Sequence, residues 1–142
     1  MGTDPLLLVD AANVVGSRPD GWWRDRFAAT ARLRDRLAPI ARTGLPGLAA
    51  PIEVVLVVEG AARRVPGVSG VRVVPAAGSA DDAIVALVRA EAVGRSCVVV
   101  TADRELRSRV AALGAEVRGP RALDLGPPAP AAGADANELS ET

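Results

Sequence analysis

Two short apolar runs, each followed by an acidic residue, constrain the fold of this chain more than any other feature. Residues 6–9 are followed by Asp10, and residues 54–58 are followed by Glu59. An unbroken run of Val and Leu of this length is typical of a strand that is buried on both faces, as in a parallel sheet. Neither run is long enough to span a bilayer. The chain is therefore expected to build its core around a parallel sheet whose strands end in acids.

Helical patterns alternate with these strand-like runs. Apolar residues recur at spacings near three and four in residues 22–40 and 79–92, and a third helix is predicted at residues 105–113. Residues 14–21 contain Gly and Pro and are predicted to form a loop. The alternation predicts an α/β fold, a three-layer α/β/α sandwich with a mainly parallel sheet of about five strands. The strands are expected at residues 6–10, 52–58, 71–74, 97–100 and 116–118, with a further short piece at residues 122–125.

The folded part of the chain is predicted to end near residue 125. A chain of 142 residues, 49% of them hydrophobic, is long enough for one domain with a single core, which we place at residues 1–125. Beyond this point the composition changes to Pro, Ala and Gly, followed by small polar residues. Such a segment buries too little apolar surface to offset the entropy lost on ordering. Residues 126–142 are therefore predicted to be a disordered tail.

The residue types that are missing exclude several kinds of chemistry. The chain has no His and one Cys, which excludes histidine general bases, Ser/His/Asp triads and His- or Cys-ligated zinc sites. All 17 basic residues are Arg, and 17 acidic residues balance them. This balance argues against a strongly basic nucleic-acid binder but permits RNA contact over a small patch. Cys97 cannot form an internal disulfide and the N-terminus lacks the basic stretch of a secretion signal, so a cytoplasmic location is expected.

Carboxylates are the groups left to carry chemistry, and they follow the predicted strands. Asp10, Glu59 and Asp103 lie at or just past the carboxyl ends of three strands. Asp81 and Asp82 lie in the first turn of the helix after the third strand. Ligands of parallel sheets bind in the crevice outside the carboxyl ends of the strands. Carboxylates gathered there would repel one another, and Mg²⁺ or Mn²⁺, which take hard oxygen ligands, would relieve that repulsion. All five acids are therefore candidate metal ligands.

Helix phase separates the neighbouring acids Asp81 and Asp82. Asp81 precedes Ile84 by three residues and Val88 by seven, so it shares their inner face. Asp82 lies about 100° further round the helix. Asp81 is therefore the stronger ligand candidate, whereas Asp82 is expected to lie behind the ligands or to help cap the helix. Glu59 is the weakest candidate, because a long side chain at a strand end can also reach solvent.

Most of these acids also have a purely structural explanation. Ser79 and Asp82 are close to a capping box at the start of a helix. Asp103 is placed to cap the third predicted helix. Asp10 together with Asn13 fits ordinary turn chemistry. These explanations stay open at the level of the sequence.

Four motifs around the acids resemble those of NYN domains, a branch of the PIN-like nucleases, and in particular the YacP-like group. Residues 10–13 read DAAN and resemble the Asp-Gly-x-Asn opening of that group. Residues 55–59 resemble its second strand, and residues 79–84, SADDAI, resemble its Thr-Ala-Asp-x-x-Ile helix start. Residues 101–103, TAD, resemble its Thr-Ser-Asp strand end. The motifs occur in the family's order, with similar spacing, from residue 5 to about 125.

The resemblance implies a PIN-like sandwich and a metal-dependent ribonuclease activity. Carried over position by position, it makes Asp10, Asp81 and Asp103 the carboxylates of the metal site. It makes Asn13 a catalytic polar contact to metal-bound water or phosphate, and Thr101 a hydroxyl near the site. The cofactor it implies is Mg²⁺ or Mn²⁺.

Two positions depart from the family's pattern. Ala11 stands where the family usually has Gly, which restricts how closely the backbone can approach a phosphate. Glu59 replaces the usual Asp, so its carboxylate reaches further by one methylene. Neither change removes the three acids that the resemblance makes the metal ligands.

RNA phosphates also require cations near the acids. Arg18 lies in the first predicted loop, Arg26 falls within the apolar stripe of the first predicted helix, and Arg104 follows the acid of the fourth strand. We expect these arginines to contact the RNA, together with Asn13 and Thr101. A surface arginine whose stem covers apolar residues explains Arg26 as well. Trp22 and Trp23 are candidates for base stacking, or for anchoring the helix to the core.

The hypothesis that follows is a metal-dependent ribonuclease with RNA as its partner and no small-molecule cofactor beyond the metal. Two alternatives stay open, namely a metal-dependent nucleotide phosphohydrolase and a non-catalytic PIN-like module that binds RNA or a protein. A P-loop or dinucleotide site is excluded, because residues 11–15 contain no Gly. An enzyme is expected to hold the carboxylates of Asp10, Asp81 and Asp103 within a few ångströms, whereas a binding module need not. No membrane partner is expected, and a homodimer is left open.

Overall fold

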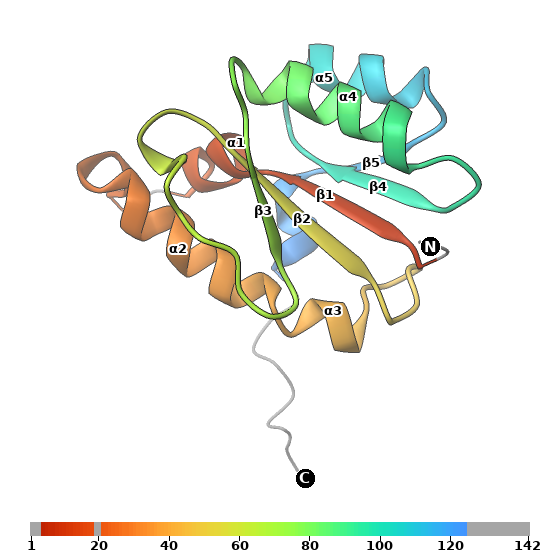
Figure 1. Cartoon of the computed structure of the whole chain (residues 1–142), viewed down its shortest axis with the longest axis horizontal. Coiled ribbons are helices and arrows are strands. Elements are labelled where there is room, and N and C mark those ends of the chain that lie inside the picture. The colour runs from red at the N-terminus through yellow and green to blue at the C-terminus, as the bar shows by residue number, and fades with distance from the viewer. Residues whose placement is uncertain (1–3, 19–20, 125–142) are drawn as a thin grey trace, which may run out of the picture.

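The computed structural model describes residues 4–18 and 21–124. Five parallel strands form one sheet in the order β3-β2-β1-β4-β5 (Figure 1). The predicted parallel sheet of about five strands is therefore confirmed. The strands are β1 (Leu6–Asp10), β2 (Glu53–Val58), β3 (Arg72–Pro75), β4 (Cys97–Val100) and β5 (Glu116–Arg118). Residues 125–142, which include the whole of the predicted disordered tail, lie outside the described part of the chain.

Helices cover both faces of the sheet, as Figure 1 shows. One face carries α1 (Ala11–Gly16), α2 (Arg26–Leu37) and α3 (Ile40–Thr43), and the other carries α4 (Ala80–Glu91) and α5 (Arg104–Ala111). Single 3₁₀ turns are found at η1 (Trp22–Arg24), η2 (Gly60–Ala62) and η3 (Pro120–Leu123). The three-layer sandwich is thus confirmed. No helix within residues 4–18 and 21–124 combines the length and the apolar character needed to cross a membrane.

The strands β1, β2 and β4 each contribute to two hydrophobic cores, because successive side chains of a strand point to opposite faces. On β1, Leu7 and Val9 pack with α1, α2 and α3, whereas Leu6 and Leu8 pack with α4 and α5. These four side chains are 0% exposed. This double burial explains why the strand sequences are unbroken apolar runs and do not alternate with polar residues.

The loop predicted at residues 14–21 is wrong at residues 14–16, because these belong to the helix α1. Asp10 caps this helix by accepting a hydrogen bond from the backbone N–H of Asn13. Val14 and Val15 are buried on its inner side. Gly16 therefore ends a short helix, and the predicted loop begins only after it.

The single helix predicted at residues 22–40 is divided into three pieces, η1, α2 and α3. Asp25 caps α2 by accepting from the backbone N–H of Ala28, at 2.9 Å, so the helix starts afresh there. Pro39 has no N–H to continue the hydrogen-bond ladder beyond Leu37. The predicted apolar stripe is otherwise confirmed, since its members from residue 29 onward are buried.

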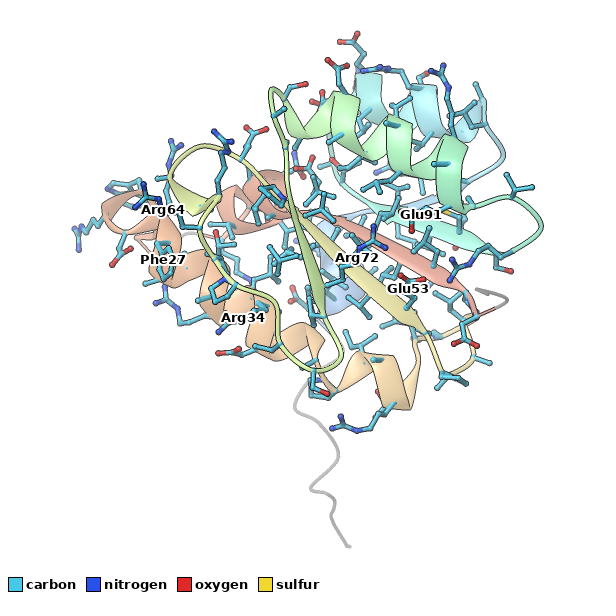
Figure 2. All side chains as sticks on the ribbon, in the orientation of Figure 1. Phe27, Arg34, Glu53, Arg64, Arg72 and Glu91 are labelled. Carbon is cyan, nitrogen blue, oxygen red and sulfur yellow. The ribbon has the colours of Figure 1, made fainter. Side chains whose placement is uncertain are left out.

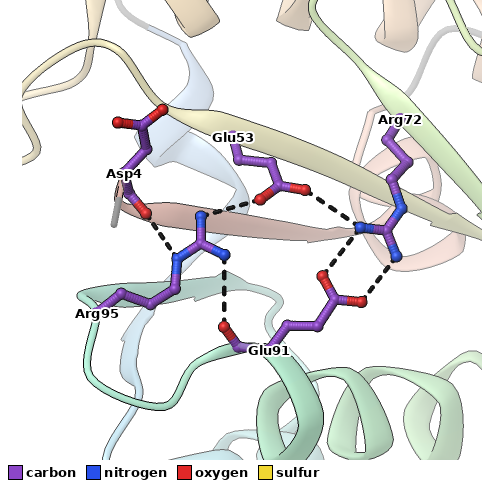
Figure 3. A network of polar contacts seen from close by, with 5 residues as sticks. All are labelled: Asp4, Glu53, Arg72, Glu91 and Arg95. Atoms are coloured by element: carbon purple, nitrogen blue, oxygen red, sulfur yellow. Dashed lines mark hydrogen bonds and ion pairs between the residues drawn. The ribbon is translucent and has the colours of Figure 1, made fainter. Parts of the chain in front are cut away.

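A network of ion pairs holds the amino-terminal edge of the sheet. Figure 2 shows Glu53, Arg72 and Glu91 together in this region, and Figure 3 shows the contacts. The Arg95 side chain is 5% exposed, and its guanidinium donates to the Asp4 carbonyl at 2.6 Å, to the Glu91 carbonyl at 3.4 Å and to the Glu53 carboxylate at 2.9 Å. Arg72 bridges the carboxylates of Glu53 and Glu91. This ion-pair network therefore lies at the opposite edge of the sheet from the predicted site.

Candidate functional site

Asp10 ends β1 at the carboxyl-terminal edge of the sheet and is 4% exposed. Its Oδ1 accepts from the Asn13 backbone N–H at 3.4 Å, and its Oδ2 accepts from the Thr101 hydroxyl at 3.0 Å. Among the described residues it has no ion pair with any arginine. Burial raises the pKa of Asp10 to about 6; its two hydrogen bonds oppose this rise, and the negative charges of Asp81 and Glu59 add to it.

Thr101 and Asn13 join the end of β1 to the segment after β4. Thr101 is 0% exposed, and its hydroxyl also accepts from the Asp103 backbone N–H at 3.1 Å. The Asn13 side-chain carbonyl accepts from the Ala102 N–H at 2.8 Å. The Asn13 side-chain NH₂ makes no hydrogen bond to a described residue, so it stays available as a donor at this edge. The hydroxyl of Thr101, in contrast, is fully used inside the protein.

Asp81 and Asp103 approach the same edge from α4 and α5. Asp103 caps α5 by accepting from the Leu106 N–H at 3.0 Å, as its structural explanation predicts. Asp81 is half-buried, and no hydrogen bond or ion pair joins it to a described residue. Burial raises the pKa of Asp81, and the charges of Asp103 and Glu59 raise it further, against a lowering effect of Arg109. Asp81 is therefore a carboxylate held near other carboxylates without a paired cation.

Glu59 and Asp82 have definite partners. The Glu59 carboxylate accepts from the Ala80 backbone N–H at 2.6 Å, which ties the end of β2 to the start of α4. Asp82 points outward, with its side chain 77% exposed, and forms an ion pair with Arg109 at 3.1 Å. Its backbone N–H donates to the Ser79 hydroxyl at 3.2 Å, which completes the predicted helix cap. The structure thus separates Asp82 from Asp81, as helix phase predicts.

Four carboxylates, which we call the acid edge, lie at this edge of the sheet: Asp10, Glu59, Asp81 and Asp103. These carboxylates come from four separate segments. The negative charges of Asp81 and Glu59 help to raise the pKa of Asp10, and those of Asp103 and Glu59 help to raise the pKa of Asp81. Within residues 4–18 and 21–124, however, no three acidic or Cys side chains stand close enough to form a ready-made metal site. The close gathering expected of the three aspartates is therefore absent as the side chains lie. The donors themselves fit a hard divalent cation, because they are carboxylate oxygens whose mutual repulsion such an ion would relieve.

The predicted arginines lie at different distances from the chemistry. Arg26 begins α2 and lines a cavity together with Glu59, so the structure places it beside the acid edge. Arg104 is exposed and follows Asp103 directly. Arg18 forms an ion pair with Asp124 near the end of the described chain. Arg18 is therefore occupied by a carboxylate.

Two arginines that the sequence patterns did not single out lie beyond Glu59. Arg63 and Arg64 follow η2, are exposed, and line a second cavity of about 430 Å³ with Pro75. Figure 2 shows Arg64 on the same side of the molecule as Phe27. Their place in the segment that follows the strand-ending acid Glu59 was the signal that could have identified them.

All three aromatic residues of the chain occur between positions 22 and 27. Trp23 is 59% exposed and Phe27 is 43% exposed, an unusual placement for the largest apolar side chains. The Arg24 guanidinium lies over the Trp23 ring, 5.8 Å from its centroid. An exposed aromatic surface with adjacent arginines is typical of single-stranded nucleic-acid binding.

No protein-family model and no curated protein matches the sequence. The crystal structure of Rae1 (YacP) from Bacillus subtilis matches the fold with a TM-score of 0.66 and 23% identity, over 83% of this chain and 70% of that one. The W164L mutant of the same protein matches with a TM-score of 0.64 and 22% identity, over 84% and 72%. The chain has a YacP-like NYN fold. At this identity the similarity establishes the fold, because one fold can host different sites.

Within this YacP-like NYN fold, Thr101 is expected to hold the acid edge in place. Replacing Thr101 with valine removes the donor to Asp10 and leaves that buried carboxylate less satisfied. We expect the free energy of unfolding to fall by about 1–3 kcal/mol, measured by urea denaturation at pH 7. Thr101→Ser keeps the hydroxyl and is the matched control. Equal losses in both variants would mean that packing of the methyl group, and not the hydrogen bond, stabilises this edge.

Proposed function

We propose that this chain is a metal-dependent ribonuclease whose chemistry takes place at the acid edge. The observation that carries the proposal is Asp10, a carboxylate 4% exposed with no cationic partner among the described residues. Folding holds this group at the edge where parallel sheets bind their ligands, although burial and neighbouring acids make its charge unfavourable. Unfavourable charge of this kind clusters at functional sites. The YacP-like NYN fold and the four motifs that resemble those of NYN domains are the reasons for proposing a nuclease.

Asp10, Asp81 and Asp103 are the residues that would hold Mg²⁺ or Mn²⁺. When bound, the ion lowers the pKa of a water molecule and stabilises negative charge on the phosphate oxygens. Asn13 would donate its free side-chain NH₂ to a phosphate oxygen, while its carbonyl keeps the bond to Ala102. Thr101 would keep Asp10 in position. This route needs no imidazole base, which suits a chain without His. We expect products with a 5′-phosphate and a 3′-hydroxyl.

The surroundings of the acid edge suit a single RNA strand. We place the reaction in the reducing cytoplasm, as expected for a chain with one Cys. Arg26, Arg63, Arg64 and Arg104 are exposed and can pair with phosphates. The formal net charge is zero, so this attraction is local and salt-sensitive. The exposed rings of Trp23 and Phe27 would stack on bases of the strand.

The neighbouring acids Asp81 and Asp82 allow a matched test of the proposal. Cleavage of a mixed-sequence single-stranded RNA would be followed with Mn²⁺, Mg²⁺ or EDTA, alongside the metal-induced rise in melting temperature. Outer-layer mutations at metal sites typically cost about 10–100-fold, so Asp81→Asn, which changes a ligand, is expected to reduce cleavage at least about 100-fold. It should also remove the metal-induced thermal shift. Asp82→Asn loses only an exposed ion pair and is expected to behave as the wild type.

Other outcomes would favour other functions. Equal loss in the two variants, or cleavage that persists in EDTA, would contradict the proposal. Phosphate release from free nucleotides without RNA cleavage would favour a nucleotide phosphohydrolase. The second candidate is a non-catalytic RNA-binding module, which is favoured by the exposed Trp23 and Phe27 and by the lack of a ready-made metal site in the described residues. RNA binding without cleavage in any metal would support it.

A further inference from the structure

A cavity of about 210 Å³ lies between α1, α2 and the end of β2. Its walls are small apolar side chains, Ala11, Val15 and Ala62 among them. Ala12 and Arg26 also line it and are exposed, so the cavity is reached from solvent on their side. Sites for drug-sized ligands measure about 300–1,000 Å³. The cavity therefore suits something smaller, such as one flat ring system.

Thr30 gives this cavity a polar group without a partner. It lies on α2, one turn after Arg26, and is 3% exposed. A threonine inside a helix commonly returns its hydroxyl to the carbonyl four residues earlier. Here the Thr30 hydroxyl forms no hydrogen bond with any part of the chain that the structure describes. A buried hydroxyl left without a partner is unfavourable in the free protein, and a ligand in the cavity would satisfy it.

The cavity is continuous with the acid edge. Glu59 lines it, and the same carboxylate accepts from the Ala80 N–H and adds its charge to those of Asp10 and Asp81. Ala11 and Ala12, which form another part of its lining, follow Asp10 directly in the chain. A molecule in the cavity therefore lies beside the edge at which the phosphate is proposed to be cut.

We propose that this cavity is a nucleobase subsite, which holds one base of the RNA strand next to the cleaved phosphate. The proposal rests on the function proposed above. An unstacked base presents hydrogen-bond donors and acceptors side by side on its edge. The Thr30 hydroxyl can serve as donor or acceptor, the Glu59 carboxylate as acceptor, and the Arg26 guanidinium as donor to the base or to its phosphate. The alanine and valine walls leave room for the ring and exclude water from its faces.

The subsite would make the enzyme prefer one base at one position beside the cut. The four bases carry different patterns of hydrogen-bond donors and acceptors on their edges. They would therefore match the carboxylate, hydroxyl and guanidinium of the cavity to different extents. A base whose edge leaves one of these groups unpaired, above all the buried Thr30 hydroxyl, would be bound less well. Such selectivity depends on the cavity and not on the metal, which allows the two proposals to be tested apart.

The test measures binding of the four nucleoside 5′-monophosphates to the full chain in EDTA, by calorimetry or NMR titration. We expect at least one nucleotide to bind, and Ala12→Leu, which fills the cavity from its exposed side, to weaken that binding at least about tenfold. Thr30→Val removes the hydroxyl at nearly constant volume and is expected to weaken binding by about 2- to 10-fold. Ala86→Leu adds the same leucine at an exposed position of α4, on the other face of the sheet and outside the cavity, and is the matched control.

Melting temperatures distinguish a binding role from a structural one. Thr30→Val removes an unpartnered buried hydroxyl, so it should be as stable as the wild type or more stable while binding less well. A destabilised Thr30→Val variant with unchanged nucleotide binding would overturn the proposal, as would nucleotide binding that Ala12→Leu leaves intact.

The RNA products give an independent readout in the presence of metal. The base beside the cut, read by sequencing product ends, should be biased in the wild type and in Ala86→Leu, and less biased in Ala12→Leu. Cleavage with no base bias in any variant would overturn the subsite and leave the nuclease standing. Nucleotide binding with the expected pattern, in a chain that cuts no RNA, would uphold the subsite and reject the nuclease.

Discussion

Replacing Asp10 with asparagine is expected to abolish RNA cleavage while making the folded protein more stable. The change keeps the size of the side chain and a carbonyl oxygen for the cap of α1, but it removes the negative charge proposed to hold the metal. Removal of a charged catalytic group typically costs on the order of 10³–10⁴-fold in rate. We expect a loss of this size with Mn²⁺ and with Mg²⁺. Cleavage would be measured on a mixed-sequence single-stranded RNA.

The stability effect follows from the raised pKa of Asp10, about 6 against an ordinary value of 3.8. Below pH 3.8 the carboxyl is protonated in both the folded and the unfolded state and does not affect stability. Between pH 3.8 and 6 the unfolded state ionises first, which favours unfolding, and above pH 6 the full penalty applies. At about 1.36 kcal/mol per pKa unit, this penalty is about 3 kcal/mol.

Asp10→Asn escapes this penalty because its side chain does not ionise. Its free energy of unfolding at pH 7–8 without metal should exceed that of the wild type by up to about 3 kcal/mol, and the difference should vanish below pH 4. Urea denaturation across this pH range measures it, with Asp82→Asn as a control that has an exposed carboxylate. A variant less stable than the wild type at pH 7 would mean that Asp10 is a structural cap and not a strained functional group.

Replacing Arg95 with methionine is expected to cause a large loss of stability without affecting the site. The Arg95 side chain is 5% exposed and joins the Asp4 carbonyl, the Glu91 carbonyl and the Glu53 carboxylate by hydrogen bonds. Removing one partner of a buried charged network leaves its other members unsatisfied. We expect a loss of roughly 3 kcal/mol, or on the order of 10 °C in melting temperature.

Arg72→Met is the matched control for this prediction. Arg72 belongs to the same network, but its side chain is 45% exposed, so solvent replaces much of what it loses. A cost of about 1 kcal/mol or less is expected. Because the network lies at the opposite edge of the sheet from the acid edge, the cleavage rate of folded protein should be unchanged in both variants. Equal losses of stability would show that burial of Arg95 does not matter.

The strands and the ordering of the acids could be predicted because they depend on local pattern. The apolar runs that became β1, β2 and β4 are buried on both faces, so no alternation with polar residues obscures them. Helix phase also separated Asp81 from Asp82, because both lie in the first turn of one continuous helix. The boundaries around α1 and α2 were missed because capping by Asp10 and Asp25 competed with the loop signal of Gly and Pro.

Roles that depend on partners distant in sequence could not be predicted. Asn13 contacts Ala102 and Arg18 contacts Asp124, and nothing near these residues in the chain indicates either contact. In the sequence, Thr30 is an ordinary residue of a predicted helix, and only the structure shows the cavity beside it. The strand-ending acids and the absence of His limited the proposed chemistry to carboxylates from the sequence alone.

The sequence by itself determined the parallel sheet and the edge at which the acids collect, since strand direction and strand ends are properties of short segments. Only the tertiary structure decided which carboxylates are buried without a cation, which are occupied by caps and ion pairs, and where a cavity opens. The physical reason is that burial and charge interaction depend on distances between segments, and only packing determines those distances.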